Sequence, residues 1–135
     1  MKKLFGVVFL FFLTAACRSD NPVDSVDLLH NRWHLYQTRR IQDVAWTIQD
    51  TDAYYDTEYR PDGTVVYRKN GAQIGGSCCA PTRYSRQGLT INYSAWNLCA
   101  NAFCATLKQV TISQLTETLL EVNDGYMISQ YERVD

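Results

Sequence analysis

Two turn triplets, Pro61-Asp62-Gly63 and Asn123-Asp124-Gly125, each lie between two short segments in which apolar and polar residues alternate. Alternation with a period of two is typical of a β-strand with one buried face, because successive side chains point to opposite sides. Proline fixes φ in the first turn, and glycine takes the positive φ that tight turns need. Each triplet therefore predicts a β-hairpin.

The same alternation recurs from residue 28 onward, beginning with Trp33 and Leu35 on one side of a strand and His34 and Tyr36 on the other. Strands are predicted at 32–40, 53–60, 64–69, 82–86, 89–93, 105–113, 119–122 and 126–134. About eight short strands joined mostly by tight turns are typical of an up-and-down barrel, whose interior is filled by side chains or holds one small ligand. The sequence therefore predicts an all-β fold, a small antiparallel β-barrel.

Residues 1–16 have the features of an export signal: two lysines precede an uncharged apolar run. The run is too short to cross about 30 Å of hydrocarbon as a helix, which needs roughly 20 residues. It ends in Leu13-Thr14-Ala15-Ala16-Cys17, which resembles the bacterial lipobox with leucine one place further from the cysteine than usual. The resemblance implies a signal peptide over 1–16, a lipidated Cys17 with a polar tether over 17–27, and a domain over 28–135. The alternative is an ordinary cleaved signal and an unmodified Cys17.

Five cysteines are an odd number for an exported chain. Lipidation of Cys17 leaves Cys78, Cys79, Cys99 and Cys104, an even set in two loop clusters. A bridge between adjacent cysteines would close a strained ring, so we predict two disulfides between the clusters, with the pairing left open. A zinc or copper site is the rival, but the spacing departs from C-x₂-C and no histidine lies nearby, so we expect no metal.

The charge balance argues against nucleic acid as a partner. The chain has 13 Lys+Arg and 14 Asp+Glu, and loss of Lys2 and Lys3 leaves 11 against 14, whereas nucleic acid requires a basic face. No hydrolase or phosphate-loop motif occurs, so we expect no catalytic residues, no enzymatic activity and no cofactor. His30 and His34 would lie about 13 Å apart on a strand, which favours solvent exposure over a shared metal.

Nine tyrosines and three tryptophans dominate the chain from residue 28 onward. An aromatic wall with polar tips suits a pocket that orients an amphipathic ligand, and it equally suits a solid core or a protein-contact surface. The ligand-binding candidates are Tyr55, Tyr59, Tyr67, Tyr84, Tyr93 and Trp96. Trp46, in the long connection 41–52, is either a plug of the core or a lid over a pocket.

Short motifs recur in the expected order along the predicted strands. They are Leu29-x-x-x-Trp33-x-Leu35, Pro61-Asp62-Gly63-Thr64, Leu89-Thr90-Ile91, Ile112-x-x-Leu115-Thr116-x-x-x-Leu120 and Tyr131-Glu132-Arg133. Together they resemble the lipocalin-like lipoproteins of the Bacteroidetes type, although Asn31 stands where true lipocalins have glycine. The resemblance implies a barrel on the cell envelope with Arg133 over the Trp33 ring, closing one end; the alternative for Arg133 is a solvated terminal charge.

Two functions are expected. The first is a lipid-anchored binding module for a small apolar or amphipathic ligand. The second is a structural or inhibitor-like lipoprotein whose barrel is filled and whose partner is an envelope protein. Arg18 follows Cys17 and is not the aspartate that retains enterobacterial lipoproteins at the inner membrane, so we expect attachment to the outer membrane of a bacterial envelope.

Overall fold

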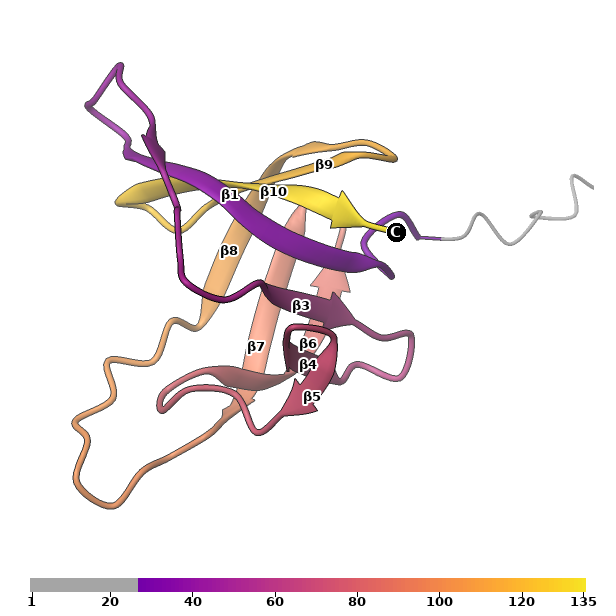
Figure 1. Ribbon diagram of the computed structural model, residues 1–135, viewed down its shortest axis with the longest axis vertical. Coiled ribbons are helices and arrows are strands. Elements are labelled where there is room, and N and C mark those ends of the chain that lie inside the picture. Colours follow the sequence, from indigo (N-terminus) through magenta and orange to yellow (C-terminus); the bar gives the residue numbers. More distant parts are fainter. Residues whose placement is uncertain (1–26) are drawn as a thin grey trace, which may run out of the picture.

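The computed structural model describes residues 27–135, which form one sheet of antiparallel strands and contain no helix (Figure 1). The strands are β1 (Arg32–Arg40), β2 (Thr47–Ile48), β3 (Tyr55–Tyr59), β4 (Val65–Lys69), β5 (Ala72–Ile74), β6 (Pro81–Gln87), β7 (Thr90–Trp96), β8 (Gln109–Leu115), β9 (Leu119–Asn123) and β10 (Met127–Val134). The all-β prediction is therefore confirmed for these residues. Each predicted strand has a counterpart, while the short β2 and β5 lie in segments predicted as connections.

The N-terminal predictions fall outside the described residues. They are the signal peptide over 1–16, the lipidated Cys17, and the tether over 17–27 apart from its last residue. Within 27–135, no helix is long and apolar enough to serve as a membrane span.

The strands follow the order β5-β4-β3-β1-β10-β9-β8-β7-β6 across the sheet, and β2 pairs with β1 off this path. From β6 to β10 the chain meanders, with each strand beside the one before it. The first and last long strands, β1 and β10, lie side by side (Figure 1), with a register that runs from Arg32↔Val134 to Arg40↔Met127. The β1–β10 pair therefore joins the N-terminal strands β1–β5 to the C-terminal strands β6–β10 in one curled sheet.

The two edges of the curled sheet approach each other at one point. Thr64 forms an isolated bridge with Arg83 of β6, and the Tyr84 N–H donates to the Gly63 carbonyl at 2.8 Å. A Cβ at residue 63 would lie 2.8 Å from the Tyr84 carbonyl oxygen, and φ there is 78°, so this approach requires glycine.

No ladder of strand pairs joins β4 to β6 in the described residues, so the sheet is not closed, unlike the predicted barrel. The reason is β5. It pairs with β4 from Tyr67↔Ile74 to Lys69↔Ala72 and so occupies the edge that β6 would otherwise extend along. The sequence did not predict β5, and the closed barrel was predicted without it.

The core lies inside the curl, and Trp33 marks its end near the start of β1. Trp33 is 1% exposed, and its Nε1–H donates to the Leu29 carbonyl at 3.1 Å. Ile91, Ile112 and Leu120 are also fully buried. Buried aliphatic residues from β7, β8 and β9 thus pack with an indole from β1, which fills this end of the sheet.

Alternation in residues 53–60 puts Tyr55, Thr57 and Tyr59 on one side of the strand, predicted to face inward, and Tyr54, Asp56 and Glu58 on the other, predicted to face solvent. Asp56, however, is only 3% exposed. Arg32 donates to its two carboxylate oxygens at 3.0 and 2.7 Å, and Arg68 Nη1 lies 3.9 Å from it. Arg68 also pairs with Glu58. Two arginines from the flanking strands therefore cover the carboxylate, and a buried charge persists only when it is paired in this way.

Candidate functional site

A pocket of about 290 Å³ lies against the inner side of β1, β3, β4 and β10. Trp33 pairs with Thr57, and Thr57 pairs with Tyr67, so these three side chains from adjacent strands lie on the same face. Leu35 follows Trp33 at the same strand period, and Tyr131 is its partner on β10. The lining is completed by Tyr55, Asp56, Arg68, Ile74, Gly76 and Ser77.

The size and charge of this pocket restrict what it accepts. Its volume of about 290 Å³ is roughly twice that of a cavity of about 150 Å³ that binds benzene. It therefore fits a molecule of on the order of ten to fifteen non-hydrogen atoms. Asp56 and Arg68 are the charged residues of the lining, and each is engaged in the ion cluster with Arg32 and Glu58. The wall therefore offers no free charge, and a neutral ligand fits it best.

Tyrosine hydroxyls supply the polar groups of the interior. The hydroxyls of Tyr59 and Tyr93 share a hydrogen bond of 2.8 Å, and the Tyr67 hydroxyl donates to the Pro81 carbonyl at 2.6 Å. Burial raises the pKa of Tyr59, Tyr67 and Tyr93 above the usual value. These phenols therefore stay neutral at physiological pH, and they act on a ligand through hydrogen bonds and not through charge.

Tyr131 divides the interior into two compartments. It lines the pocket described above and also a hollow of about 90 Å³ that Tyr93, Leu107 and Val110 help to line. Burial raises the pKa of Tyr131 as well. A ligand in either compartment would therefore contact a neutral phenol.

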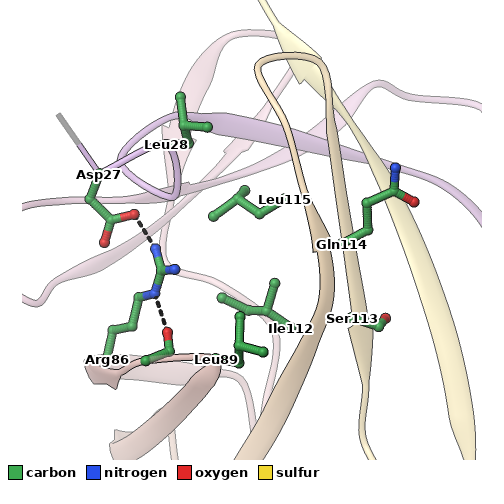
Figure 2. Close-up of a pocket in the computed structure, with 9 residues that line it drawn as sticks. Asp27, Leu28, Arg86, Leu89, Ile112, Ser113, Gln114 and Leu115 are labelled. Atoms are coloured by element: carbon green, nitrogen blue, oxygen red, sulfur yellow. Dashed lines mark hydrogen bonds and ion pairs between the residues drawn. The ribbon is translucent and has the colours of Figure 1, made fainter. Parts of the chain in front are cut away.

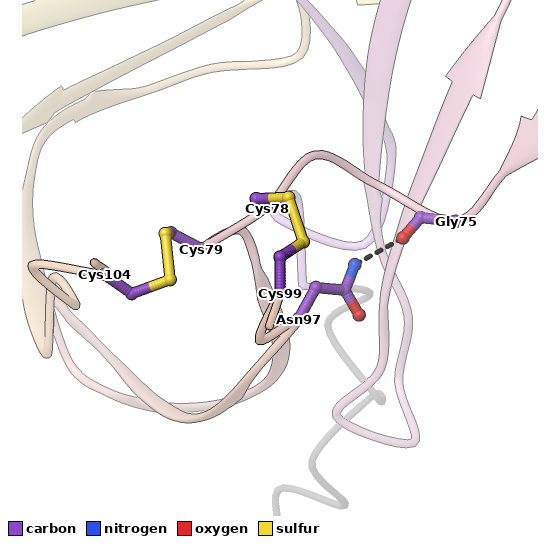
Figure 3. Close-up of a disulfide and its surroundings, with 6 residues drawn as sticks. All are labelled: Gly75, Cys78, Cys79, Asn97, Cys99 and Cys104. Atoms are coloured by element: carbon purple, nitrogen blue, oxygen red, sulfur yellow. Dashed lines mark hydrogen bonds between the residues drawn. A yellow bond between two sulfur atoms is a disulfide. The ribbon is translucent and has the colours of Figure 1, made fainter. Parts of the chain in front are cut away.

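Two disulfides hold the loops after β5 and β7 together at the end of the sheet opposite the start of β1. Cys78 is bonded to Cys99, and Cys79 to Cys104 (Figure 3). Two bridges between the clusters were predicted, and the structure supplies the pairing that the sequence left open. Asn97 reinforces the junction, because its side-chain amide donates to the Gly75 carbonyl and its own carbonyl accepts from Cys79 N–H at 2.7 Å.

The tied loop after β5 borders the pocket. Ile74, Gly76 and Ser77 all contribute to its lining. Residue 76 has φ of 70°, and a Cβ there would lie 2.7 Å from the Tyr67 ring. Glycine is therefore required where this loop passes over the aromatic wall.

A second, wider hollow lies at the other end, near the start of the described chain (Figure 2). Asp27 accepts from Arg86, whose Nε donates to the Gly88 carbonyl at 2.7 Å. Leu28 and the exposed Leu89 also line this groove. The groove is open to solvent and its two charges neutralise each other, so the tyrosine-lined pocket is the better candidate site.

The predicted aromatic candidates are distributed between pocket, core and surface. Tyr67 lines the pocket and Tyr93 the adjoining hollow. Tyr55 was predicted to face inward, but it is 43% exposed, and Lys69 Nζ lies 5.7 Å from its ring centre, so it forms only the rim. Trp96 is partly buried and lines neither hollow.

Tyr59 and Tyr84 belong to the core cluster, with their rings edge to face at 5.0 Å. The Tyr84 hydroxyl donates to the Arg60 carbonyl at 2.8 Å, across the gap between the two edges of the sheet. Their role in the structure is therefore packing and edge contact.

Trp33 and Arg133 are register partners in the β1–β10 pair. The Arg133 side chain is exposed, and its Nη1 donates to the Glu117 carbonyl at 3.5 Å. Among the described residues, one cation–π contact places Arg39 over Trp46 at 4.9 Å, and none joins Arg133 to Trp33. Trp46 is half-buried and lies outside the core cluster, so it does not act as the plug.

Sequence reasoning did not assign most of the pocket lining, including Leu35, Thr57, Ile74 and Tyr131. Alternation placed Leu35 beside Trp33 and Thr57 on the inward face of its strand, so a signal for these two existed. Ile74 lies on β5, where it pairs with Tyr67, and this strand was predicted as part of a connection, so alternation did not assign it.

The two histidines lie apart. His34 stacks on Tyr54 with ring centres 4.0 Å apart, and its Nδ1 lies 2.7 Å from the Tyr55 carbonyl oxygen, while His30 lies 3.9 Å from Asp27. Across residues 27–135, no three His, Cys, Asp or Glu side chains gather closely enough to hold a metal ion.

Comparison with protein-family models, curated proteins and solved structures returned no match to this chain.

Proposed function

We propose that this protein is a lipid-anchored, lipocalin-like lipoprotein of the bacterial envelope that binds a small neutral amphiphile inside its curled sheet. The tyrosine-lined pocket of about 290 Å³ is the observation that carries the proposal. Apolar faces of Trp33, Leu35 and Ile74 surround the ligand's hydrocarbon part, and the neutral hydroxyls of Tyr67 and Tyr131 contact its polar group.

The lipocalin-like part of the proposal is supported by topology. If β2 and β5 are set aside, eight strands follow an up-and-down order in which β1 is next to β10. The Thr64–Arg83 bridge and the hydroxyl contact of Tyr84 stand where the eighth ladder of a barrel would be. Loss of the β5 hairpin would free this edge of β4 for β6.

Calorimetric titration tests the pocket. The experiment uses the chain from Arg18 to Asp135, which lacks the apolar N-terminal run. It keeps every described strand, the core and both disulfides. We expect saturable binding of short 1-alkanols and 4-alkylphenols, and weaker binding of carboxylates of equal length, because the site offers no free cation.

Ile74→Trp, at the pocket rim, should weaken this binding at least tenfold. Leu89→Trp, in the solvent-open groove, is the matched control and should bind as the unmodified chain does. Equal affinity of Ile74→Trp and the unmodified chain would place the ligand elsewhere and refute the proposed site.

The anchor is a separate part of the proposal and rests on the lipobox-like Leu13-Thr14-Ala15-Ala16-Cys17. Several acyl chains on Cys17 would attach the protein stably, because each buried CH₂ contributes about 0.8 kcal/mol. Mass spectrometry of the mature N-terminus should find a diacylated or triacylated Cys17, and fractionation should place the protein in the outer membrane. An unmodified Cys17 would refute the anchor.

The second candidate is a structural or inhibitor-like lipoprotein with a filled interior. The observation in its favour is the hydrogen bond between Tyr59 and Tyr93, which links β3 to β7 across the interior. Absence of binding by every member of the ligand series, together with capture of a specific envelope protein by cross-linking, would favour this function over the first.

A further inference from the structure

The loops joined by the disulfides form a distinct region, which we call the cysteine lobe: residues 70–80 and 97–107. In Figure 1 these loops lie away from the C-terminal end of β10, which marks the end of the sheet where β1 begins. The lobe therefore stands at the opposite end of the molecule from Asp27, where the described chain starts.

The cysteine lobe contains no charged residue. The chain average of 20% charged residues would place about four charges in these 22 positions. A lysine adjoins each loop: Lys69 directly precedes residues 70–80, and Lys108 directly follows residues 97–107. A neutral tip with a cationic border thus occurs in a chain whose net charge is −1.

Large apolar side chains protrude from this neutral tip. Phe103 is fully exposed and Leu98 is 75% exposed, and Ile74 and Leu107 are also exposed. Phe103 and Leu98 belong to the same loop, on either side of Cys99. Exposed apolar groups that lie together, bordered by polar residues, are typical of a surface that contacts a protein or a membrane.

The lobe presents these side chains on a constrained backbone. Cys78–Cys99 and Cys79–Cys104 tie the two loops together (Figure 3). In addition, Asn97 N–H donates to the Ala80 carbonyl at 2.9 Å. The entropy that a flexible loop would lose on binding is therefore largely lost already in the free protein.

We propose that the cysteine lobe is a membrane-contacting tip that inserts Leu98 and Phe103 into the boundary between headgroups and acyl chains of a phospholipid bilayer. Lys69 and Lys108 would then lie at the level of the phosphates. The charge pattern favours a bilayer over a protein partner. Insertion requires that no charge enter the apolar layer, and cations next to the inserted segment are attracted to phosphate. Protein interfaces are enriched in arginine and depleted in lysine, whereas the lobe contains no arginine and the cations that adjoin it are lysines.

This contact goes beyond the proposed function, because it needs neither the pocket nor the lipid anchor. It would give the protein a second, reversible attachment at the end opposite residue 27. The mouth of the pocket, bordered by Ile74 and Ser77, would then open toward the bilayer.

Vesicle flotation tests the proposal with the chain from Arg18 to Asp135 and phosphatidylcholine vesicles, with and without phosphatidylglycerol. We expect flotation with both, and a modest gain with the anionic lipid that salt removes. Leu98→Ser and Phe103→Ser together should lower the partition coefficient about 100-fold, because burying each side chain contributes about tenfold or more. Val44→Ser is the control. Val44 is almost fully exposed, but it lies outside the lobe and next to the charged Asp43, so this substitution should leave the partition coefficient unchanged.

Tryptophan emission locates the contact. In Phe103→Trp the emission should shift to the blue with vesicles and be quenched by brominated lipid, whereas Val44→Trp should show neither effect. Absence of flotation, or flotation that survives the double serine substitution, would overturn the proposal. The proposal would also be overturned if the chain did not bind vesicles but formed dimers that the same substitutions dissociate, because the lobe would then bind a second copy of the chain.

Discussion

Removal of one disulfide should lower the free energy of unfolding by less than half as much as removal of both, because the two bridges close overlapping loops. Cys78–Cys99 and Cys79–Cys104 join residues 21 and 25 positions apart. For a single loop of either length, the loss of chain entropy in the unfolded state corresponds to about 3.5 kcal/mol at 25 °C. If the bridges acted independently, each would contribute this amount.

They do not act independently, because either bridge already holds the ends of the other close together. With Cys78–Cys99 intact, Cys79 and Cys104 are linked through Cys78, the bridge and residues 99–104. This ring has about eight residues, for which the same relation gives about 2.5 kcal/mol. The ring is the same when Cys79–Cys104 is the bridge that remains.

Chemical denaturation measures these costs by linear extrapolation. Cys78→Ser with Cys99→Ser, and Cys79→Ser with Cys104→Ser, should each lower the free energy of unfolding by about 2.5 kcal/mol. The fourfold variant should lose about 6 kcal/mol, comparable to the whole stability of many small domains. Losses of about 3.5 kcal/mol for each pair and about 7 kcal/mol for the fourfold variant would refute the overlapping-loop reasoning.

Three further predictions concern the interior. Trp33→Ala should lower the free energy of unfolding by about 3–5 kcal/mol in a thermal or denaturant melt, because the indole is fully buried; an unchanged melt would refute its packing role. Tyr59→Phe and Tyr93→Phe should each cost about 1 kcal/mol, and a double-mutant cycle should show coupling through their shared hydrogen bond; strictly additive costs would contradict it. Burial raises the pKa of Tyr84 to about 12, above the value near 10 of an unfolded tyrosine. Burial of the neutral Tyr84 phenol therefore stabilises the fold fully below about pH 10, and this stabilisation is lost as the pH rises to about 12. Denaturation at a series of pH values would detect the loss. A denaturation midpoint that stays constant over this range would show that the fold does not protect the Tyr84 phenol from ionisation.

The strands were largely predictable because each has a local signal. Alternation located β1 at Arg32–Arg40 with its observed bounds, and the triplets before β4 and β10 identified two hairpins. The three-residue β5 is too short for alternation to be measured, and the Asn70-Gly71 turn signal before it was interpreted as part of a connection. It pairs with β4 through the two-residue turn Asn70-Gly71, in which both residues have positive φ. This one short strand separates the observed open sheet from the predicted closed barrel.

The site was less predictable, because it depends on contacts between distant segments. Asp56 is buried by arginines that lie 24 and 12 positions away in sequence, on β1 and β4, so its own strand predicts only a solvent-facing acid. Tyr55 occupies an inward position by alternation, yet it lies where β3 begins and the chain no longer covers it. Tyr67 lines the pocket, because its strand continues past it on both sides and keeps its side chain on the inner face.

Nuclear magnetic resonance of the chain from Arg18 to Asp135, titrated with a 4-alkylphenol, tests the central claim most directly. If the interior of the curled sheet is a binding pocket, saturable chemical-shift changes will concentrate at Trp33, Thr57, Tyr67 and Tyr131 on four adjacent strands. Shifts confined to the exposed Leu98 and Phe103 and their neighbours in residues 97–107, or no saturable shift at any residue, would contradict it.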